Sequence, residues 1–554
     1  MFCKQAKWSG RLLLAVAALC CGVAHGNKPP NILLLVAEDL GPRIGAFGDA
    51  VAQTPHIDRL AAAGVRFDHV FSAAGVCAPN RSALMTGRYP QTIGTQHMRT
   101  SRLNYEAVPP AGVRAFPELL RRAGYVTANT AKTDYQFGEP STIWNVNVND
   151  FAAPPDLAVW RRLPADQPFF AMINFLSTHE SRLVTEETVA AGPYARYVQA
   201  LVAQRKRDVA PVTDPKAVVV PPYYPDTDAV RASIAQHYDN VHFMDQQVGQ
   251  VLAHLLEDDL LDNTIVIWTT DHGDGLPRAK RAVYDSGLHV PLLIRFPDGR
   301  RAGQLDSRMI SFVDLAPIIL GLAGVETPSA MQGHNVLDPQ LPPRRYAFAG
   351  RDRMDELMDR VRAVRDKRYK YIRNYHTAEP YLRPLVFRDM FPVMVELWRA
   401  HEQGQLTAQQ QFYFDAPRPV EELYDTQTDP YEVVNLVGDP DYADPLSRLR
   451  AAMDNWLQRV GDMSRLAEAV MIEQMWPGGE QPVTAVPEVS ERNGQYQLRS
   501  TTPGASIMFR ILKEHARWQI YSEFSALPQR VRLEAKAVRY GYKDSPVLVF
   551  KTSG

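Results

Sequence analysis

The residues best suited to chemistry lie in the segment Cys77-Ala78-Pro79-Asn80-Arg81-Ser82-Ala83-Leu84-Met85-Thr86-Gly87-Arg88. Pro79 suits the first turn of a helix and Gly87 suits the position just past its end. The spacing therefore predicts a short helix that begins near Cys77. Because the free N–H groups at a helix start attract anions, this cysteine is expected beside an anion-binding site.

Cys77 is expected to be the lone cysteine of the mature protein. The other three, Cys3, Cys20 and Cys21, lie in an N-terminal leader that is predicted to be removed. A lone cysteine cannot form an internal disulfide, and most such cysteines are small buried hydrophobic residues. That alternative leaves Pro79, Arg81 and Gly87 unexplained, so we favour a functional role.

Two adjacent acids follow the first predicted strand. The apolar run 31–36 has the length of a strand buried on both faces of a parallel sheet, and Glu38 and Asp39 come next. Ligands bind at the carboxyl ends of strands in open α/β sheets, so these acids indicate a site for a hard cation. A solvated pair of loop acids is the alternative. A second run of this kind, 263–270, ends in Asp271 and His272.

The spacing around Cys77 resembles the signature of the type I sulfatases, Cys-x-Pro-x-Arg followed by Ser-x-x-x-Thr-Gly-Arg. The resemblance covers residues 28–460, and its blocks occur in family order. It implies an α/β, alkaline-phosphatase-like fold: a central, mostly parallel sheet flanked by helices, and a smaller C-terminal subdomain with an antiparallel sheet. It also implies hydrolysis of sulfate esters or sulfamates of a sulfated saccharide.

In this family a separate maturation enzyme oxidises the cysteine to formylglycine, which the resemblance assigns to Cys77. The hydrated gem-diol attacks sulfur, the alcohol leaves, and the second hydroxyl expels sulfate to restore the aldehyde. The resemblance also implies one Ca²⁺, for which the candidate ligands are Glu38, Asp39, Cys77, Asp271 and His272. Glu38 replaces the usual aspartate. His272 could contact the nucleophile instead, because calcium prefers oxygen ligands.

Sulfate recognition is assigned by the resemblance to Arg81, Lys132, His179 and Lys280. The divalent cation and the positive charges of Arg81, Lys132 and Lys280 would neutralise the transferred and departing oxygens. His179 could be a sulfate ligand or the acid that protonates the leaving oxygen, with a structural histidine as the alternative. The family usually has Gly-Lys-Trp-His where this chain has Ala-Lys-Thr-Asp. An anionic Asp134 would repel sulfate, so it is expected to orient Lys132 or to contact another part of the substrate.

Further substrate contacts are predicted from His97, in the polar segment 93–99, and from Arg353 and Asp355 in the C-terminal region. A surface loop is the alternative for His97. The segment 350–355 and the replaced histidine resemble the heparan N-sulfatase-like branch. Which sugar is bound, and whether the sulfate is O- or N-linked, stays open at this point.

The ends of the chain suggest export and an accessory module. Residues 1–26 have the basic start, apolar run and small-residue exit of a signal peptide, which predicts a periplasmic or secreted enzyme. The catalytic domain is expected at 28–341, its C-terminal subdomain at 342–474, and a linker at 475–486. Residues 487–554 resemble the small β-sandwich of some chitobiase-like glycosidases. A lipid anchor at Cys20 or Cys21 is the alternative to a soluble product.

The composition and charge of the chain limit the kinds of molecule that it is expected to bind. The 554 residues are 45% hydrophobic and 22% charged, as in soluble globular proteins. Removing the three basic leader residues lowers the formal net charge from −1 to −4, which argues against nucleic-acid binding. With no second long apolar run, stable membrane insertion is not expected. The rival functions are a phosphonate or phosphate ester hydrolase of the same superfamily and an inactive glycan-binding relative.

Overall fold

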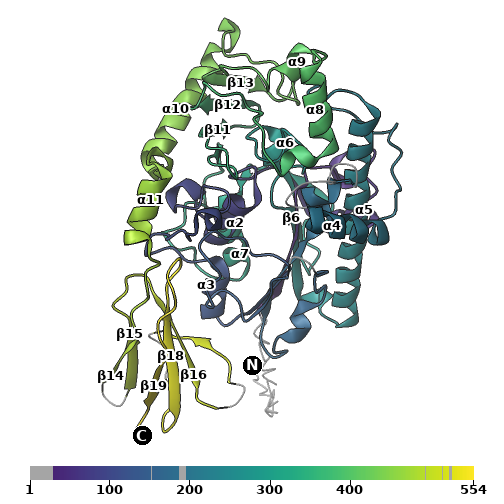
Figure 1. Cartoon of the computed structure of the whole chain (residues 1–554). Helices are drawn as coiled ribbons and strands as arrows, with labels where there is room; N and C mark the ends of the chain where they lie inside the picture. Colours follow the sequence, from purple (N-terminus) through teal and green to yellow (C-terminus); the bar gives the residue numbers. More distant parts are fainter. Residues whose placement is uncertain are drawn as a thin grey trace, which may run out of the picture.

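The computed structural model describes residues 29–150, 153–185, 195–492, 495–513, 516–522 and 527–553. The predicted signal peptide, 1–26, lies outside the described residues. Figure 1 shows an α/β body, a smaller sheet at one end of it and a β-rich module at the other, with α10 and α11 running along one side between them. Crossing a bilayer takes a helix that is both long and strongly apolar, and within the described ranges none is both.

The body is built on a mixed sheet that has nine strands within the described residues. Its order is β4-β3-β5-β1-β6-β7-β2-β8, and β9 also pairs with β2. The run from β4 to β6 is parallel, whereas β7 is antiparallel to both β6 and β2. The strands are β1 Asn31–Ala37, β2 Val65–Phe71, β3 Val126–Thr130, β4 Val146–Val148, β5 Phe169–Phe175, β6 Thr264–Thr270, β7 His289–Arg295, β8 Gln304–Asp306 and β9 Ile310–Ser311.

The central strands are apolar along most of their length because helices cover both faces of the sheet. Alternate residues of β1 belong to different cores: Leu34 packs in the core that includes α2, α3 and α7, and Leu35 in the core that includes α1 and α5. Figure 1 shows α2, α3 and α7 on one side of β6 and α5 on the other. The predicted α/β class is confirmed. The helices are α1 Pro55–Ala62, α2 Cys77–Thr86, α3 Phe116–Arg122, α4 Ala195–Asp208, α5 Asp228–Glu257, α6 Asp285–Leu288 and α7 Leu315–Leu322.

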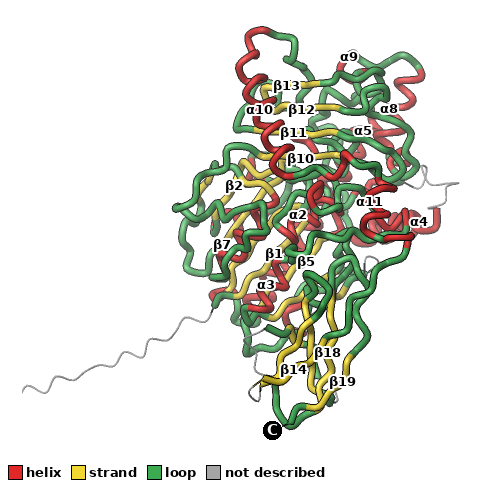
Figure 2. Tube along the Cα trace, turned by 90° about the vertical axis from the view of Figure 1, so that its left-hand side faces the viewer, coloured by secondary structure: helices red, strands yellow, loops and turns green. Residues whose placement is uncertain are grey.

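A four-stranded antiparallel sheet follows the body, with the order β10-β11-β12-β13. Figure 2 shows this ladder with α10 lying across it. The alternating segment 361–371 forms two strands, because Asp366 turns the chain by accepting from the backbone N–H groups of Arg368 and Tyr369. The elements are β10 Ala347–Arg351, β11 Val361–Arg365, β12 Tyr369–Asn374, α8 Pro392–Glu402, α9 Ala408–Gln411, β13 Glu421–Asp425, α10 Ala443–Val460 and α11 Glu468–Met475.

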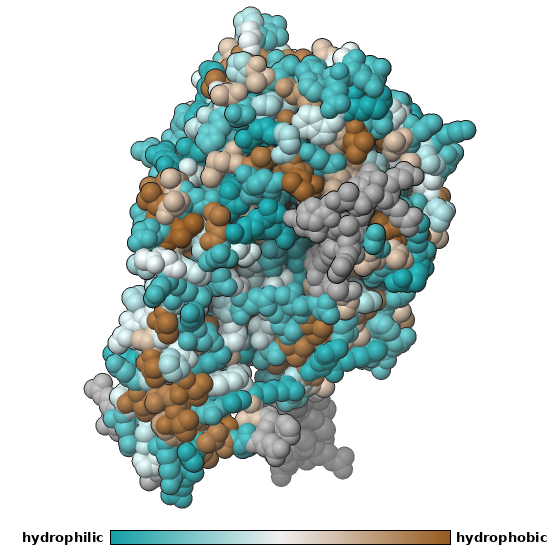
Figure 3. Space-filling view, viewed as in Figure 1, coloured by the Kyte–Doolittle hydropathy of each residue, from teal (hydrophilic) through white to brown (hydrophobic). Residues whose placement is uncertain are grey.

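The C-terminal module has a two-stranded and a four-stranded antiparallel sheet that share one apolar core. Apolar side chains gather on the face of this module seen in Figure 3. Residues 475–486 enter it through a bridge between Val483 and Lys543. The strands are β14 Glu488–Arg492, β15 Gln495–Arg499, β16 Ser506–Ile511, β17 Gln519–Ile520, β18 Arg532–Val538 and β19 Leu548–Lys551.

The module is docked on the body through buried polar contacts. The hydroxyl of Tyr540 donates to Glu118 on α3 over 2.7 Å, and the N–H of Gly541 donates to the carbonyl of Phe137 over 3.2 Å. Gly541 has a φ of +78°, and a Cβ there would lie 2.3 Å from the carbonyl oxygen of Ala107, so only glycine fits. The loop that leads away from Lys132 and Asp134 is therefore backed by this module.

Candidate active site

The predicted chemistry gathers at the carboxyl edge of the central sheet. Asp39 follows β1, Lys132 follows β3, His179 follows β5 and Asp271 follows β6, and these four strands are neighbours in the order β3-β5-β1-β6. Parallel strands deliver the residues at their carboxyl ends to one place. Cys77 joins them as the first residue of α2, and Gly87 ends that helix in the left-handed conformation, as predicted.

Four of the five predicted metal residues form one buried cluster. The Sγ atom of Cys77 lies 3.3 Å from Nε2 of His272 and 3.7 Å from Oδ1 of Asp39. The same Oδ1 lies 3.0 Å from Nε2 of His272. With Asp271 included, one potential ligand atom from each residue lies within 4.8 Å of the others, and all four side chains are buried.

Asp271 supplies the observation that tests this cluster as a cation site. Its Oδ1 accepts from the backbone N–H groups of Asp39 and His272, each over 3.0 Å. Its Oδ2 is buried and has no partner within the described residues. A buried carboxylate oxygen without a partner is destabilising, and carboxylates are the preferred ligands of hard cations. The donor set therefore fits a bound divalent cation.

The charges of the cluster depend on one another. Burial alone would raise the pKa of Asp39, but Lys280, His179 and His272 hold it well below its usual value. Burial alone would lower the pKa of His272, but Asp271 raises it well above the usual value. Burial raises the pKa of the Cys77 thiol. Because the thiolate is the nucleophilic form, unmodified Cys77 is a poor nucleophile here.

Glu38 and Arg81 lie beside this cluster. Oε1 of Glu38 accepts from Arg81 over 3.0 Å, and Oε2 pairs closely with the ammonium of Lys132. Glu38 shares a ligand group with Asp39, Cys77 and His179, but not with Asp271. Its longer side chain reaches two cations, so its carboxylate is already engaged.

The fully buried guanidinium of Arg81 also donates to the carbonyl of Thr133 over 2.9 Å and to Asn174 over 2.5 Å. These contacts engage its donors beneath the loop that carries Lys132. Arg81 therefore positions that loop in this structure, and like Cys77 it lies behind the residues that line the pocket.

Lys280 and His179 also lie beside the cluster. The ammonium of Lys280 lies 2.8 and 2.6 Å from the two carboxylate oxygens of Asp39 and 3.4 Å from Nε2 of His179. Burial would lower the pKa of Lys280, but Asp39 raises it well above its usual value. Burial and the nearby Lys280 hold the pKa of His179 well below its usual value. The imidazole of His179 is therefore neutral near pH 7, and Lys280 carries the proton.

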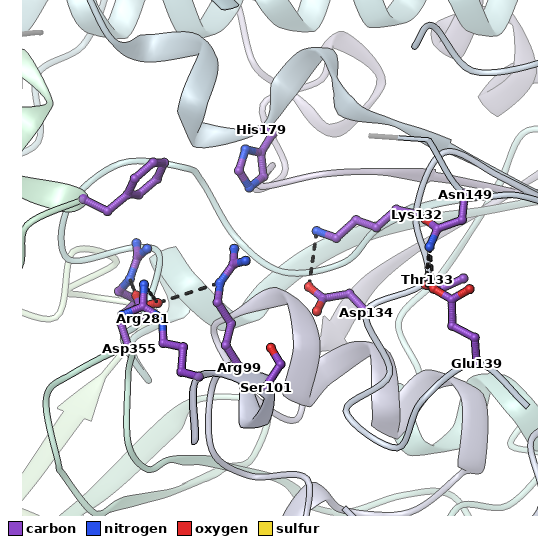
Figure 4. A pocket seen from close by; sticks show the side chains of 12 residues that line it. Arg99, Ser101, Lys132, Thr133, Asp134, Glu139, Asn149, His179, Arg281 and Asp355 are labelled. Carbon is purple, nitrogen blue, oxygen red and sulfur yellow. Dashed lines mark hydrogen bonds and ion pairs between the residues drawn. The ribbon is translucent and has the colours of Figure 1, made fainter. Parts of the chain in front are cut away.

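A cavity of about 710 Å³ opens beside the cluster. Of the predicted site residues, Lys132, Asp134, His179 and Asp355 line it, and Figure 4 shows them around the open space. The full lining is Arg99, Ser101, Arg102, Lys132, Thr133, Asp134, Glu139, Asn149, His179, Arg281, Asp355 and Phe387.

Two predicted substrate contacts lie elsewhere. His97 is buried, and its Nδ1 accepts from the backbone N–H of Arg353 over 3.3 Å. The guanidinium of Arg353 pairs with Glu468 at 2.6 Å and donates to the carbonyl of Met98. Both side chains therefore join the chain segments behind the pocket, and neither lines it.

The sequence predictions missed the three arginines that line the pocket, which are Arg102 and the pair Arg99 and Arg281. Arg99 lies in the polar segment 93–99, from which only His97 was predicted to contact the substrate. Arg281 directly follows Lys280. A structural signal marks both, since they have positive φ angles of 59° and 69°, as do Asp39, Asp134 and Asp355. Non-glycine residues in this conformation cluster at functional sites.

Comparison with known families agrees with this geometry. The model of the sulfatase family matches residues 30–325, which is more than half of the chain. This chain belongs to the sulfatase family. A second model, described as the C-terminal region of N-sulphoglucosamine sulphohydrolase, matches residues 278–383 of this sulfatase.

Two relatives and one solved structure illustrate the likeness. An ulvan-active sulfatase of Formosa agariphila is 41% identical over 95% of this chain and 91% of its own length. The N-sulphoglucosamine sulphohydrolase of Homo sapiens is 28% identical over 80% of this chain and 92% of its own. A protein solved with its substrate D-glucosamine-2-N,6-O-disulfate superimposes with a TM-score of 0.57 at 19% identity, covering 79% of this chain and 100% of that one, which supports the fold.

Proposed function

We propose that this sulfatase is an exported enzyme that hydrolyses sulfate groups of an acidic glycan, with formylglycine at position 77 and one Ca²⁺. The observation that carries the proposal is the buried cluster of Cys77, Asp39, Asp271 and His272 beside a pocket lined by Lys132 and His179.

Each residue of the site would then have its own role in the reaction. Formylglycine would supply a hydroxyl nucleophile and Ca²⁺ a positive charge beside the sulfate oxygens. Asp39 and Asp271 would hold the cation, and His272 would complete the donor set as a neutral imidazole, with the cation in place of its proton. Lys132 places a cation in the pocket wall, and Lys280 places another behind His179. Preorganised charge of this kind stabilises a transition state whose oxygens gain negative charge.

His179 faces the pocket as a neutral imidazole. It can donate one hydrogen bond to a sulfate or leaving-group oxygen, and its neighbour Lys280 holds the nearest proton reserve, 3.4 Å from Nε2. We therefore assign His179 as a substrate ligand that donates a hydrogen bond to a sulfate or leaving-group oxygen.

Ulvan oligosaccharides are the first substrates to test, because the relative with 41% identity is an ulvan-active sulfatase. A sulfamate such as glucosamine N-sulfate is the second, since the chain also matches the C-terminal region of N-sulphoglucosamine sulphohydrolase. Cleavage of the predicted leader 1–26 would place the enzyme in the periplasm or outside the cell. The C-terminal module is proposed as a carbohydrate-associated accessory domain.

The test is a sulfate-release assay with protein made in a host that contains the maturation system. Ulvan oligosaccharides, glucosamine N-sulfate and 4-nitrophenyl sulfate are compared by released sulfate. The ester 4-nitrophenyl phenylphosphonate is compared with 4-nitrophenyl sulfate by released 4-nitrophenol, and peptide mass spectrometry measures the aldehyde at position 77. We expect sulfate release and the aldehyde together. Faster hydrolysis of the phosphonate would favour the rival esterase function, and full activity with an unmodified thiol would exclude the formylglycine mechanism.

A further inference from the structure

Arg99 is the cation of the pocket that is left with the most hydrogen-bonding capacity. Its side chain is 47% exposed, and within the described residues its guanidinium makes a single ion pair, 3.8 Å from Asp355. That distance is too long for a hydrogen bond. A guanidinium has five N–H donors, so Arg99 has unused donors that face the cavity.

The other pocket cations are already paired. Arg281 makes a two-pronged contact with Glu180 at 2.7 and 2.8 Å. Lys132 pairs with Glu38. Asp355 is approached more closely by Arg102, at 3.2 Å, and by Arg281, at 3.3 Å, than by Arg99. Asp355 is thus shared among three arginines. Burial alone would lower the pKa of Arg99, but the nearby Asp134 and Asp355 raise it. Within the described residues Asp134 forms its ion pair with Lys132, at 3.9 Å, so neither carboxylate occupies the hydrogen-bond donors of Arg99.

The backbone holds Arg99 in this orientation. The residue has φ 59° and ψ 72°, a left-handed conformation that disfavours any side chain. Its neighbours are fixed on both sides, because Met98 donates to the carbonyl of Arg353 over 2.8 Å and Thr100 donates to the side chain of Gln136 over 3.3 Å. The strained turn projects the side chain into the space between the Arg281–Asp355 pair and Lys132, as Figure 4 shows.

We propose that Arg99 binds a second anionic group of the substrate, a carboxylate or another sulfate, at a site separate from the reacting sulfate. The proposal rests on the proposed sulfatase function, in which Lys132, His179 and Cys77 receive the reacting group. A planar guanidinium binds carboxylate and sulfate oxygens through paired hydrogen bonds. The preferred substrates are then glycans with a uronic acid or a second sulfate near the scissile one.

The test compares three monosulfated substrates on Arg99→Gln and on the parent enzyme. They are a disaccharide containing a uronic acid, the same disaccharide with its carboxyl reduced to an alcohol, and 4-nitrophenyl sulfate, which has no second anion. A disulfated disaccharide without a uronic acid separates the two sources of the anion. Arg161→Gln is the matched control, because Arg161 is 45% exposed but lies on the surface beside Asp258.

For Arg99→Gln we expect kcat/KM to fall by about 10- to 100-fold on substrates with a second anion, the scale of a charge-assisted hydrogen bond. The reduced disaccharide and the aryl sulfate should change less than about 3-fold, and Arg99→Lys should recover part of the loss. An equal loss on all the substrates would overturn the proposal, because Arg99 would then bind the reacting sulfate.

Binding of the desulfated disaccharide, measured by calorimetry with and without its carboxylate, tests Arg99 without turnover. Weaker binding of the carboxylate form by Arg99→Gln supports the second-anion site even if no substrate is hydrolysed, an outcome that would count against the proposed reaction. Equal binding of both forms by the parent enzyme and by Arg99→Gln would refute the site.

Discussion

The buried cluster beside the pocket, called the floor from here on, differs from the rim of the pocket in burial and in charge pairing. On the floor, the side chains of Asp39, Asp271 and His272 are fully buried, and all three follow strands of the sheet. On the rim, Arg99 and Asp134 are 47% and 26% exposed and lie on loops between elements. The floor is a closed charge network whose members set one another's pKa values, whereas the rim keeps its charges available to a ligand.

This difference separates the residues that carry out the reaction from the residues that select the substrate. Rigid strands fix groups that must meet the same sulfate in every turnover, and loops can vary without moving them. Both regions contain positive φ angles, at Asp39 on the floor and at Arg99 and Asp134 on the rim, so backbone strain alone does not tell them apart. Substitutions on the floor should therefore affect every substrate, and substitutions on the rim only some.

The largest effect is expected for Cys77→Ala. Removing the nucleophile should lower kcat on every sulfate ester on the order of 10⁶-fold, by analogy with loss of an active-site nucleophile. Sulfate release from an aryl sulfate and from a saccharide measures it, with circular dichroism as the check on folding. Residual activity above a thousandth of the parent would place the nucleophile elsewhere.

The second largest loss of activity is expected when the cation is removed. Chelation should abolish sulfate release and added Ca²⁺ should restore it, because two buried carboxylates form the proposed site. Asp271→Ala should lose bound calcium, measured by atomic emission, together with activity on all substrates. Full metal content and full activity in this variant would remove Asp271 from the site.

Lys132→Ala should lower turnover on every sulfate ester by a similar factor. The lost charge stabilises a transition state common to all of them, and by analogy with removing one oxyanion donor the loss is ~2.7–4 kcal/mol. Comparing kcat/KM for an aryl sulfate and a saccharide measures it. A loss confined to the saccharide would assign Lys132 to the rim.

Asp134→Ala should separate the two regions. We expect a loss of about 1–2 kcal/mol on the natural saccharide, whose hydroxyl or amine an aspartate can bind, and little change on a small aryl sulfate. Asp134 lies 3.9 Å from the ammonium of Lys132, so it could also act through that residue. Equal losses on the two substrates would show that it does, and would assign Asp134 to the floor.

The smallest effect on activity is expected for Tyr540→Phe in the C-terminal module. It removes the hydrogen bond to the buried Glu118, which keeps those from Thr142 and Ser506, and the one that the hydroxyl accepts from the backbone N–H of Ala115. The free energy of unfolding should therefore fall by about 2 kcal/mol. Urea unfolding measures this change. If the module supports the rim through Phe137, activity on the saccharide should fall slightly more than on the aryl sulfate. A larger loss on the aryl sulfate would contradict that link.

The residues of the floor could be predicted almost completely from the sequence, because the sequence patterns that mark them are local. An apolar run of strand length predicts a buried strand, and the acid that follows it must emerge at the sheet edge. The helix of Cys77 could likewise be predicted from Pro79 and Gly87, which mark its start and end. The resemblance of the motif around Cys77 to the sulfatase signature implied the family and its fold class, independently of any long-range contact.

Only the tertiary structure decided which polar residues face the pocket. Arg99 and His97 are two positions apart in the same polar segment, yet one projects into the cavity and the other packs against the backbone of Arg353. Arg81 was expected to contact sulfate, but Glu38 and the carbonyl of Thr133 hold it beneath the Lys132 loop. Such choices depend on which partners meet across long sequence separations, and local composition does not encode them.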